Sequence, residues 1–486
     1  MVINLLESNI FCIIALTVAP ARARAVCRYD TIDFMRLMAV ATMLAGWWIP
    51  AAQAQSAAAN DPIVVSSEHP RLFLRPARLR LLRRERERTS LRWEQFQTLM
   101  AGNAAMPEPG FAYALYYQIA SDKEAGRKAV DWTKSADADL RQMSLVFDWC
   151  YDLMSAAERE ALATRLVKKM SDAESDTSVA GTRTRTLAAV TLFDEVPGAP
   201  QRELERIVRR EWEGTIVPAI KAGGNPIHRD DAYALYEMLH AVQDNVKMDL
   251  RENVAVFFKD FPIEHLLSYY PTPYQAAEND YFIGAERTPR EPDLKLAALS
   301  RAAELAMVAY DPNAPDTQVL QGWLMHDKYL MRGAYGTPYE FLWANPYQPG
   351  LSYYHVPLVF YAPERGRLFI RSSWDDDAQW LGIFDGAMQI FSDGQVKTVN
   401  TAKPPAMIDL GEAIVCFGGS AWKQMFSLKE AETVFVTGLQ PKRTYAVEID
   451  DEEAFEATAD QAGVLALDDI PWGRAAGVRI AAAVVR

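Results

Sequence analysis

The sequence is poor in the residue types that metal, redox and nucleic-acid chemistry require. Its 486 residues include only 4 cysteines and 6 histidines, and the cysteines lack the short spacing of a metal-binding motif. The net charge of -13 leaves no basic excess of the kind that gives a general affinity for nucleic acid or anionic membranes. We therefore expect no nucleic-acid partner, no metal ion, and no nucleotide or redox cofactor.

Apolar runs long enough to cross a bilayer are also missing, and two shorter runs lie near the start of the chain. Residues 37–49 are apolar and are followed by Ala52-Gln53-Ala54, the small-x-small pattern of a signal-peptide cleavage site. Residues 10–19 form a weaker pattern of the same kind. We expect residues 1–54 to be a signal or targeting segment, with Met35 as an alternative start. The protein is then periplasmic or secreted, with no membrane span after signal cleavage.

A helical periodicity dominates the chain from His69 to about Met331, because apolar residues recur there at spacings of three and four. Candidate helices cover residues 77–100, 110–121, 139–153, 156–171, 185–194, 201–221, 231–245, 250–258, 294–310 and 316–331. Ser155 and Glu158 have the spacing of a capping box at the start of one of them. Helices of this number, joined by short loops, predict an (α/α) toroid of antiparallel helix pairs over residues 65–340.

The pattern changes after this helical region. Residues 341–366 form an aromatic junction, and residues 367–486 contain short alternating strands separated by turns such as Asp385-Gly386. They predict an antiparallel β-sandwich, in which Tyr445 after a Gly-Leu-Gln-Pro turn resembles a tyrosine corner. The expected fold class is therefore a multi-domain α + β protein.

Three stretches of the chain resemble the heparinase II/III-like polysaccharide lyases. They are HPRLFL at residues 69–74, LVFDWCYD at residues 145–152 and GRLFIRSSW at residues 366–374. The resemblance implies a helical toroid joined to a β-sandwich, and cleavage of a uronate-containing glycan by β-elimination. One departure is that residues 380–400 contain no histidine, whereas the family commonly carries a His-x-His-x-Asp stretch there.

The densest polar cluster contains Asn225, His228 and Arg229, ahead of an expected helix. A helix N-terminus favours an anion, so these side chains can neutralise a uronate carboxylate, which β-elimination requires before the C5 proton can be removed. The resemblance implies this role for an Asn or His in such a loop. In the alternative interpretation, one of the two aspartates that follow caps the helix and His228 only bonds to backbone.

The resemblance also implies a tyrosine that acts as base or acid one helical hairpin later. Tyr281 has a suitable place in the sequence, and Tyr270 and Tyr274 are alternatives. His355, at the expected domain junction, is the candidate to assist it in place of the missing β-part histidine. The predicted catalytic set is thus His228, Tyr281 and His355.

Aromatic side chains crowd the expected junction, and sugar rings stack on such faces. Trp343 and Tyr354 are the candidates for substrate binding, together with Asn225 and Arg229. Core packing between the domains explains these aromatic residues equally well. His240 follows an apolar helix face and is expected to be a core histidine.

Three functions follow as hypotheses. The first is a polysaccharide lyase, and the second is a glycan-binding or partner-binding protein without catalysis, motivated by the missing histidine-rich strand. The third is a glycoside hydrolase on a helical toroid, which needs two carboxylates. Its candidates are Asp230, Asp231, Glu237, Glu278 and Asp280. The sequence does not indicate the glycan, the oligomeric state or calcium binding by the β part.

Overall fold

The computed structural model describes residues 63–326, 330–400, 407–419, 421–429, 432–451, 453–468 and 470–483. All of them belong to one compact unit, Pro62–Arg486. The predicted signal segment and Met35 lie outside the described residues. Within the described part, no helix combines the length and the apolar character that a membrane span requires.

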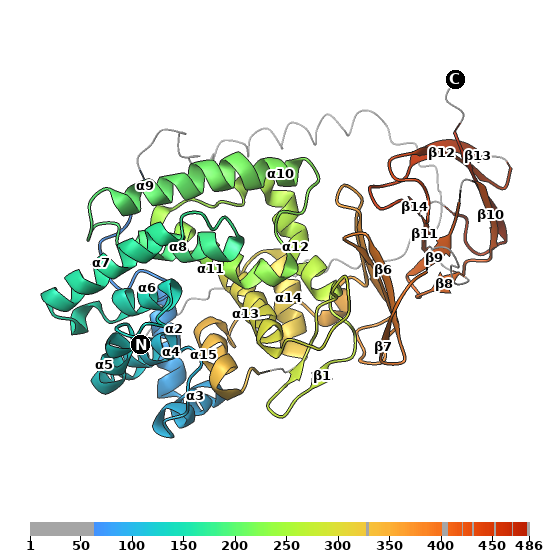
Figure 1. Cartoon of the computed structure of the whole chain (residues 1–486). Coiled ribbons are helices and arrows are strands. Elements are labelled where there is room, and N and C mark those ends of the chain that lie inside the picture. The colour runs from blue at the N-terminus through green and yellow to red at the C-terminus, as the bar shows by residue number, and fades with distance from the viewer. Residues whose placement is uncertain are drawn as a thin grey trace, which may run out of the picture. The chain divides into compact units, whose positions relative to one another are not determined.

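Helices make up the first part of the described chain, and strands follow (Figure 1). The helices are α2 (Pro76–Glu87), α3 (Leu91–Ala101), α4 (Pro109–Ala120), α5 (Lys123–Trp132), α6 (Leu140–Trp149), η1 (Tyr151–Leu153), α7 (Ala156–Asp172), α8 (Val179–Thr191), α9 (Ala199–Glu205), the π-helix η2 (Arg206–Ile216), α10 (Val217–Lys221), η3 (Arg229–Asp231), α11 (Ala232–Val246), η4 (Glu252–Val254), α12 (Ala255–Leu267), α13 (Leu294–Tyr310), α14 (Pro315–His326), α15 (Gly333–Trp343) and η5 (Tyr353–His355). The chain is thus a mixed α + β protein.

Local sequence signals fix several helix ends. The predicted capping box is confirmed, because Glu158 N–H donates to Ser155 Oγ at 3.3 Å and Ser155 N–H donates to the Glu158 carboxylate at 2.8 Å. The single helix predicted over residues 77–100 is wrong. It is broken at Thr89, whose φ is 46°, and restarts at Ser90, whose hydroxyl accepts from Trp93 N–H.

The helix α15 was not predicted. Its sequence contains Gly336 and Pro338, both of which disfavour a helix interior. Its other residues include Tyr339, Phe341 and Trp343, each at most 2% exposed. Burial of these rings therefore outweighs the poor intrinsic propensity, and such tertiary stabilisation is invisible to a local pattern.

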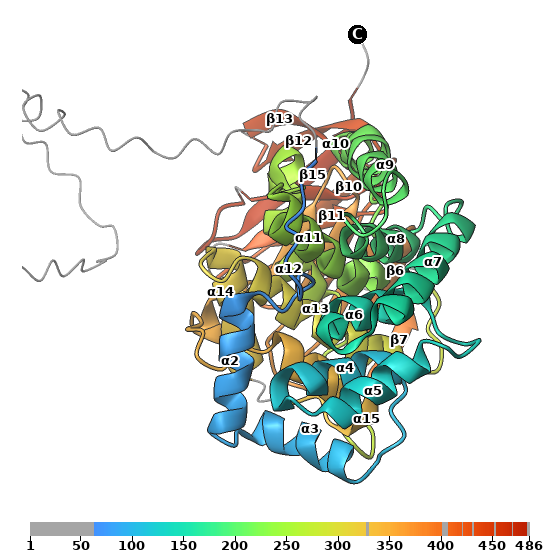
Figure 2. The same ribbon diagram turned by 90° about the vertical axis from the view of Figure 1, so that its left-hand side faces the viewer.

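Six helices contact one another in a closed circuit that can be followed in Figure 2. Helix α4 contacts α6, α6 contacts α8, α8 contacts α11, α11 contacts α13, α13 contacts α15, and α15 contacts α4. Helices α5, α7, α9 and α14 pack against members of this circuit.

The strands form three larger sheets and one short hairpin. The hairpin is β1 (Tyr274–Gln275) with β2 (Asp280–Tyr281). The first sheet has the order β3 (Val359–Ala362), β4 (Arg367–Arg371), β5 (Trp380–Phe384), β6 (Ala387–Ser392) and β7 (Gln395–Thr398). The second sheet has the order β14 (Leu465–Leu467), β11 (Thr433–Thr437), β9 (Ala413–Phe417) and β8 (Ile408–Asp409). The third sheet has the order β10 (Ala421–Phe426), β15 (Ala476–Ala482), β12 (Thr444–Ile449) and β13 (Glu453–Thr458).

The three sheets pack in layers. One face of the first sheet, with Phe369 and Trp380, packs on Leu267 of the helical part. Its other face packs on the second sheet, and the second sheet packs on the third. Strands β4, β5, β9 and β11 are therefore covered on both faces, which explains their unbroken apolar runs.

Strand pairing agrees with the prediction except at one place. The described strand pairs are antiparallel apart from β9 and β11, which pair in parallel with Ala413 opposite Thr433. The predicted tyrosine corner is confirmed, because the buried Tyr445 hydroxyl accepts from Gln440 N–H at 2.9 Å.

His240 is buried in the helical core, as expected, at 6% exposure. Its Nε2 bonds to the Ala306 carbonyl at 3.0 Å, and its ring packs against Tyr310 and Trp343. Desolvation disfavours the charged imidazolium and lowers the pKa of His240 to about 3.

We expect the free energy of unfolding to decrease as the pH is lowered from about 6.5 towards 3. His240 takes up a proton near pH ~6.5 in the unfolded chain but only near pH 3 in the folded one, so the unfolded state binds more protons in this window. The loss reaches about 2 kcal/mol between roughly pH 7 and 5. Urea unfolding at both pH values measures it. An equally large decrease in His240→Gln would contradict this assignment.

Candidate functional site

The predicted loop ahead of α11 contacts the β part. The Asn225 amide, oriented so that both its polar atoms are satisfied, donates to the Ile227 carbonyl at 3.0 Å and accepts from Arg367 of β4 at 2.9 Å. His228 is exposed, and its backbone N–H donates to the Asp231 carboxylate at 3.3 Å. Desolvation raises the pKa of the Asp231 carboxyl. Asp231 thus satisfies a backbone donor at the start of the helix, as the alternative interpretation expects.

Arg229 makes contacts in the protein interior. Its Nε donates to Ser268 Oγ and its Nη1 to Ser300 Oγ, both at 2.9 Å. The guanidinium carbon lies 4.1 Å from the ring centroid of Tyr269. A Cβ at Gly284 would approach Arg229 Nη1 to 2.3 Å, so a larger residue there would displace the guanidinium. Arg229 therefore ties the start of α11 to the segments on either side of the β1–β2 hairpin.

Tyr281 is part of the β1–β2 hairpin and is 8% exposed. Its hydroxyl accepts a hydrogen bond from Asn279 Nδ2 at 3.0 Å. The Asn279 Oδ1 accepts from the backbone N–H of Arg332 at 2.8 Å. This amide therefore holds the hairpin and the phenol of Tyr281 against the start of α15.

A cleft of about 450 Å³ opens beside this hairpin, between helical and β segments; we call it the hairpin cleft. Its lining combines aromatic side chains with ionisable ones, which is typical of a binding site. It is lined by Pro273, Ala276, Ala277, Glu278, Asn279, Asp280, Phe282, Trp323, His326, Leu330, Arg332, Trp374 and Asp376.

The aromatic residues of the hairpin cleft form a connected set. The ring centroids of Trp323 and Trp374 are 4.9 Å apart, and Phe282 lies 5.6 Å from Trp323. His326 is 6.0 Å from Trp323 and stacks on Tyr353 at 3.6 Å. Residues from the hairpin, α14, η5 and the turn after β4 therefore meet at one place.

The two tryptophans differ in the state of their indole N–H groups. Trp374 Nε1 donates to the Val356 carbonyl at 3.2 Å, and its ring lies 4.4 Å from the Arg371 guanidinium carbon. Trp323 is 3% exposed, and its Nε1 has no hydrogen-bond partner among the described residues. A buried donor without a partner costs free energy in the folded state.

The ionisable groups of the hairpin cleft carry an excess of negative charge. Glu278, Asp280 and Asp376 line it, whereas Arg332 is the cation in its lining. The Glu278 carboxylate lies close to the backbone of Gly333 at the N-terminus of α15. A Cβ added at Gly333 would be 2.0 Å from a Glu278 carboxylate oxygen.

The other predicted residues fall in different environments. His355 and Tyr354 belong to η5, both exposed, and Tyr354 contacts Tyr353 with ring centroids 4.2 Å apart. Both residues are outside the lining of the hairpin cleft, and Tyr354 is linked to the cleft residue His326 only through Tyr353. Trp343 is 1% exposed, and its Nε1 donates to the Tyr233 hydroxyl at 3.0 Å in the helical core.

Glu237 is the centre of a buried ionic network. Its carboxylate accepts from Arg141 Nη2 at 2.6 Å, from the Tyr233 hydroxyl at 2.7 Å and from Arg183. These donors lower the pKa of Glu237 to about 2, although burial alone would raise it. A carboxylate held ionised in this way cannot serve as a general acid.

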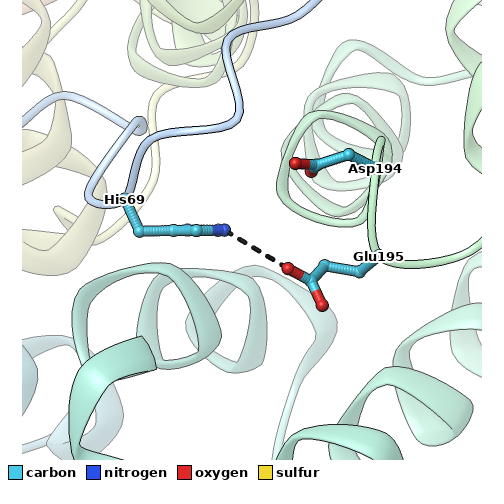
Figure 3. A group of neighbouring side chains, drawn as sticks. All are labelled: His69, Asp194 and Glu195. Atoms are coloured by element: carbon cyan, nitrogen blue, oxygen red, sulfur yellow. Dashed lines mark ion pairs between the residues drawn. The ribbon is translucent and has the colours of Figure 1, made fainter.

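A group of His69, Asp194 and Glu195 offers three donor atoms of the kind that bind metal ions (Figure 3). His69 Nδ1 donates to the Asp148 carboxylate at 2.6 Å, and its Nε2 faces Arg71 Nη2 at 2.8 Å. Arg71 Nη1 also donates to Asp194 at 2.9 Å. The guanidinium therefore supplies the positive charge that a metal ion would bring, and the geometry is that of a structural ion pair.

Sequence reasoning missed the residues that form the wall of the hairpin cleft. Trp323 and Trp374 were not singled out as binding residues, and Asp376 was not among the candidate carboxylates. Trp374 ends the third stretch of the family resemblance, beside three aspartates. A tryptophan next to an acidic run is a signal that could have selected this turn.

No protein-family model matches the chain, and a comparison with curated proteins gives no match. Among solved structures, one titled "Glycoside hydrolase" has a TM-score of 0.29 and 10% sequence identity, covering 77% of this chain and 71% of that chain. A likeness at this level supports no conclusion about function.

Proposed function

We propose that the hairpin cleft binds a carbohydrate chain and hydrolyses it with two of its carboxylates. The observation that carries this proposal is the combination of two tryptophans in contact, Trp323 and Trp374, with three carboxylates in one cleft. Sugar rings bind aromatic faces through their C–H groups, and glycoside hydrolysis uses a pair of carboxyl groups that flank the bond to be cleaved.

The carboxylates come from two sides of the cleft. Glu278 and Asp280 belong to the β1–β2 hairpin, and Asp376 belongs to the turn after β4. We propose that Asp376 and one of the hairpin carboxylates flank the scissile bond. The excess of negative charge favours an uncharged glycan, because a uronate polymer would be repelled there.

A lyase is the second candidate, and the geometry at Tyr281 favours it. The hydrogen bond from Asn279 to the Tyr281 hydroxyl strengthens when the phenol oxygen gains negative charge, which suits a proton carrier. Arg332, which lines the hairpin cleft beside Asn279, would neutralise a uronate carboxylate. In this version Tyr281 is the base and His355 remains a proposed assistant, while the roles of His228, Asn225 and Arg229 stay predictions.

The fold that the family resemblance implies is compatible with this proposal. We propose that the six-helix circuit is an (α/α) toroid and that the layered sheets correspond to the β-sandwich of the heparinase II/III-like proteins. We keep the domain limits 65–340, 341–366 and 367–486 as predictions. The signal segment, if it is cleaved as proposed, makes the site of action periplasmic or extracellular.

Incubating the purified protein with neutral glucans and xylans, and separately with alginate, pectin and heparan polymers, tests the proposal. New reducing ends and the absorbance of unsaturated products are followed in the same reactions. Hydrolysis gives reducing ends without the absorbance, and we expect this result on a neutral polymer. Absorbance on a uronate polymer would support the lyase instead. Binding without either signal would leave a non-catalytic glycan-binding protein, and neither binding nor cleavage would sink the proposal.

Replacing Asp376 by asparagine is expected to lower the cleavage rate at least about a hundredfold, because proton transfer by a positioned carboxyl contributes a factor of roughly 10²–10⁴. Asp280→Asn and Glu278→Gln identify its partner. Asp377→Asn is the matched control, since Asp377 is an exposed neighbour outside the lining of the cleft. Equal rates for the Asp376 and Asp377 variants would contradict the assignment, and melting temperatures within a few degrees of wild type exclude misfolding.

A further inference from the structure

A second hollow lies on the other side of the β1–β2 hairpin. Its volume is about 270 Å³, and it is bounded by segments of the helical part and by strands β6 and β7 of the first sheet. Aromatic and proline side chains dominate its lining, which includes Tyr270, Tyr274, Pro289, Pro292 and Phe391. This hollow contains none of the carboxylates that we propose for catalysis.

The second hollow adjoins the hairpin cleft. Pro273 lines both of them. Thr272, which lines the second hollow, donates to the carbonyl of Asp376, which lines the hairpin cleft, at 2.6 Å. Only Pro273 and the hydrogen bond between Thr272 and Asp376 therefore separate the second hollow from the hairpin cleft. A flexible carbohydrate chain can pass over them.

The side chains of the second hollow suit a sugar ring. Tyr270 is held rigidly, because its hydroxyl donates to Gln389 at 2.9 Å and its ring stacks on Phe391 with centroids 5.8 Å apart. Tyr274 is 40% exposed, so part of its side chain is accessible to a ligand. An ion pair of Arg290 with its neighbour Glu286, at 2.7 Å, supplies donors and acceptors for hydroxyl groups.

We propose that the second hollow is a further subsite for the chain bound in the hairpin cleft, so that the protein recognises a polymer laid across the β1–β2 hairpin. This inference rests on the proposed function, and it specifies the substrate as a chain long enough to fill both hollows. Tyr274 is then a specificity residue for chain length. It takes no part in the chemistry.

The test is the dependence of affinity on chain length, measured by calorimetry with the full chain. The probes are cello-, xylo- and galacturonic acid oligosaccharides from the disaccharide to the hexasaccharide. We expect the wild type to bind longer members of one series more tightly. Tyr274→Ala should weaken binding of the longest member about tenfold and leave the disaccharide unchanged, because one stacking contact is lost.

Tyr347→Ala is the matched control, since Tyr347 is 45% exposed and lies against Arg84 and Arg88 of α2. It should change the affinity for no member of the series. A wild-type affinity that is the same for every length, or a Tyr274→Ala variant that binds the longest member as tightly as the wild type, would overturn the subsite. Weaker binding of the disaccharide by the same factor would also overturn it, because Tyr274 would then belong to the hairpin cleft.

The two proposals fail in different ways. Oligosaccharides that bind without a length effect contradict the subsite alone. A wild type that binds no oligosaccharide and cleaves no polymer overturns both the proposed function and the subsite.

Discussion

Replacing Glu237 by alanine is expected to lower the free energy of unfolding by about 3–5 kcal/mol. The Glu237 side chain is 0% exposed and balances the charges of Arg141 and Arg183. Removing it leaves these guanidinium groups buried with one fewer anion between them, and it removes the acceptor of the Tyr233 hydroxyl. An uncompensated buried charge costs more than the pair contributed, so the loss is large.

Denaturant unfolding measures this effect, and Glu124→Ala is the matched control. Glu124 forms an exposed pair with Lys128 one helical turn away, and the loss there should stay within about 0.5 kcal/mol. Glu237→Gln should be intermediate, because an amide keeps one acceptor oxygen. If Glu237→Ala and Glu124→Ala unfold at the same denaturant concentration, the network does not stabilise the fold.

The free energy of unfolding that this network contributes should decrease at acidic pH. The folded pKa of Glu237 is about 2, below its ordinary value of 4.5, so its stabilisation is present above about pH 4.5 and is lost as the pH falls towards 2. The wild type should therefore lose more stability than Glu237→Gln in this window.

Replacing Asp148 by alanine is the second change with a large expected effect, again about 3–5 kcal/mol. Its carboxylate is 1% exposed as part of α6 and accepts from His69 Nδ1 at 2.6 Å, from Arg71 N–H at 3.0 Å and from Leu72 N–H at 2.7 Å. Without it, two buried backbone donors and a histidine lose their partner. The segment that leads into α2 then loses its anchor.

Hydrogen exchange distinguishes a local from a global effect of Asp148→Ala. The amides of Arg71 and Leu72 should lose protection first, and the melting temperature should fall with them. Asp152→Ala is the control, because Asp152 is an exposed residue of the same sequence stretch. Unchanged protection of both amides in Asp148→Ala would show that Asp148 is not the anchor.

Signals that act over a few residues were readable from the sequence. The cap of α7 at Ser155 and the corner at Tyr445 depend on contacts within three to five residues, and both were predicted. Helix α13 also has the predicted ends, Leu294 and Tyr310. In each case the chain itself brings donor and acceptor together.

Signals that depend on distant partners were not readable. The break at Ser90 interrupts a continuous apolar periodicity, and α15 forms despite Gly336 and Pro338. The β part was predicted as short alternating strands of an antiparallel sandwich, but the sequence did not indicate that β9 and β11 are covered on both faces and pair in parallel. Local propensity is worth a few tenths of a kcal/mol per residue, so burial in the folded protein decides such cases.

The candidate site was also predicted only in part from the sequence. The sequence alone determined an acidic, mixed α + β chain, and it singled out Tyr281, Glu278 and Asp280 as residues able to carry chemistry. Only the tertiary structure decided that Glu278 and Asp280 line one cleft with Trp323 and Trp374, and that Tyr281 is buried behind Asn279 of that lining, because this depends on packing between segments far apart in the chain. Side-chain types follow from the sequence, whereas their convergence follows from how the hairpin, α14 and the first sheet pack together.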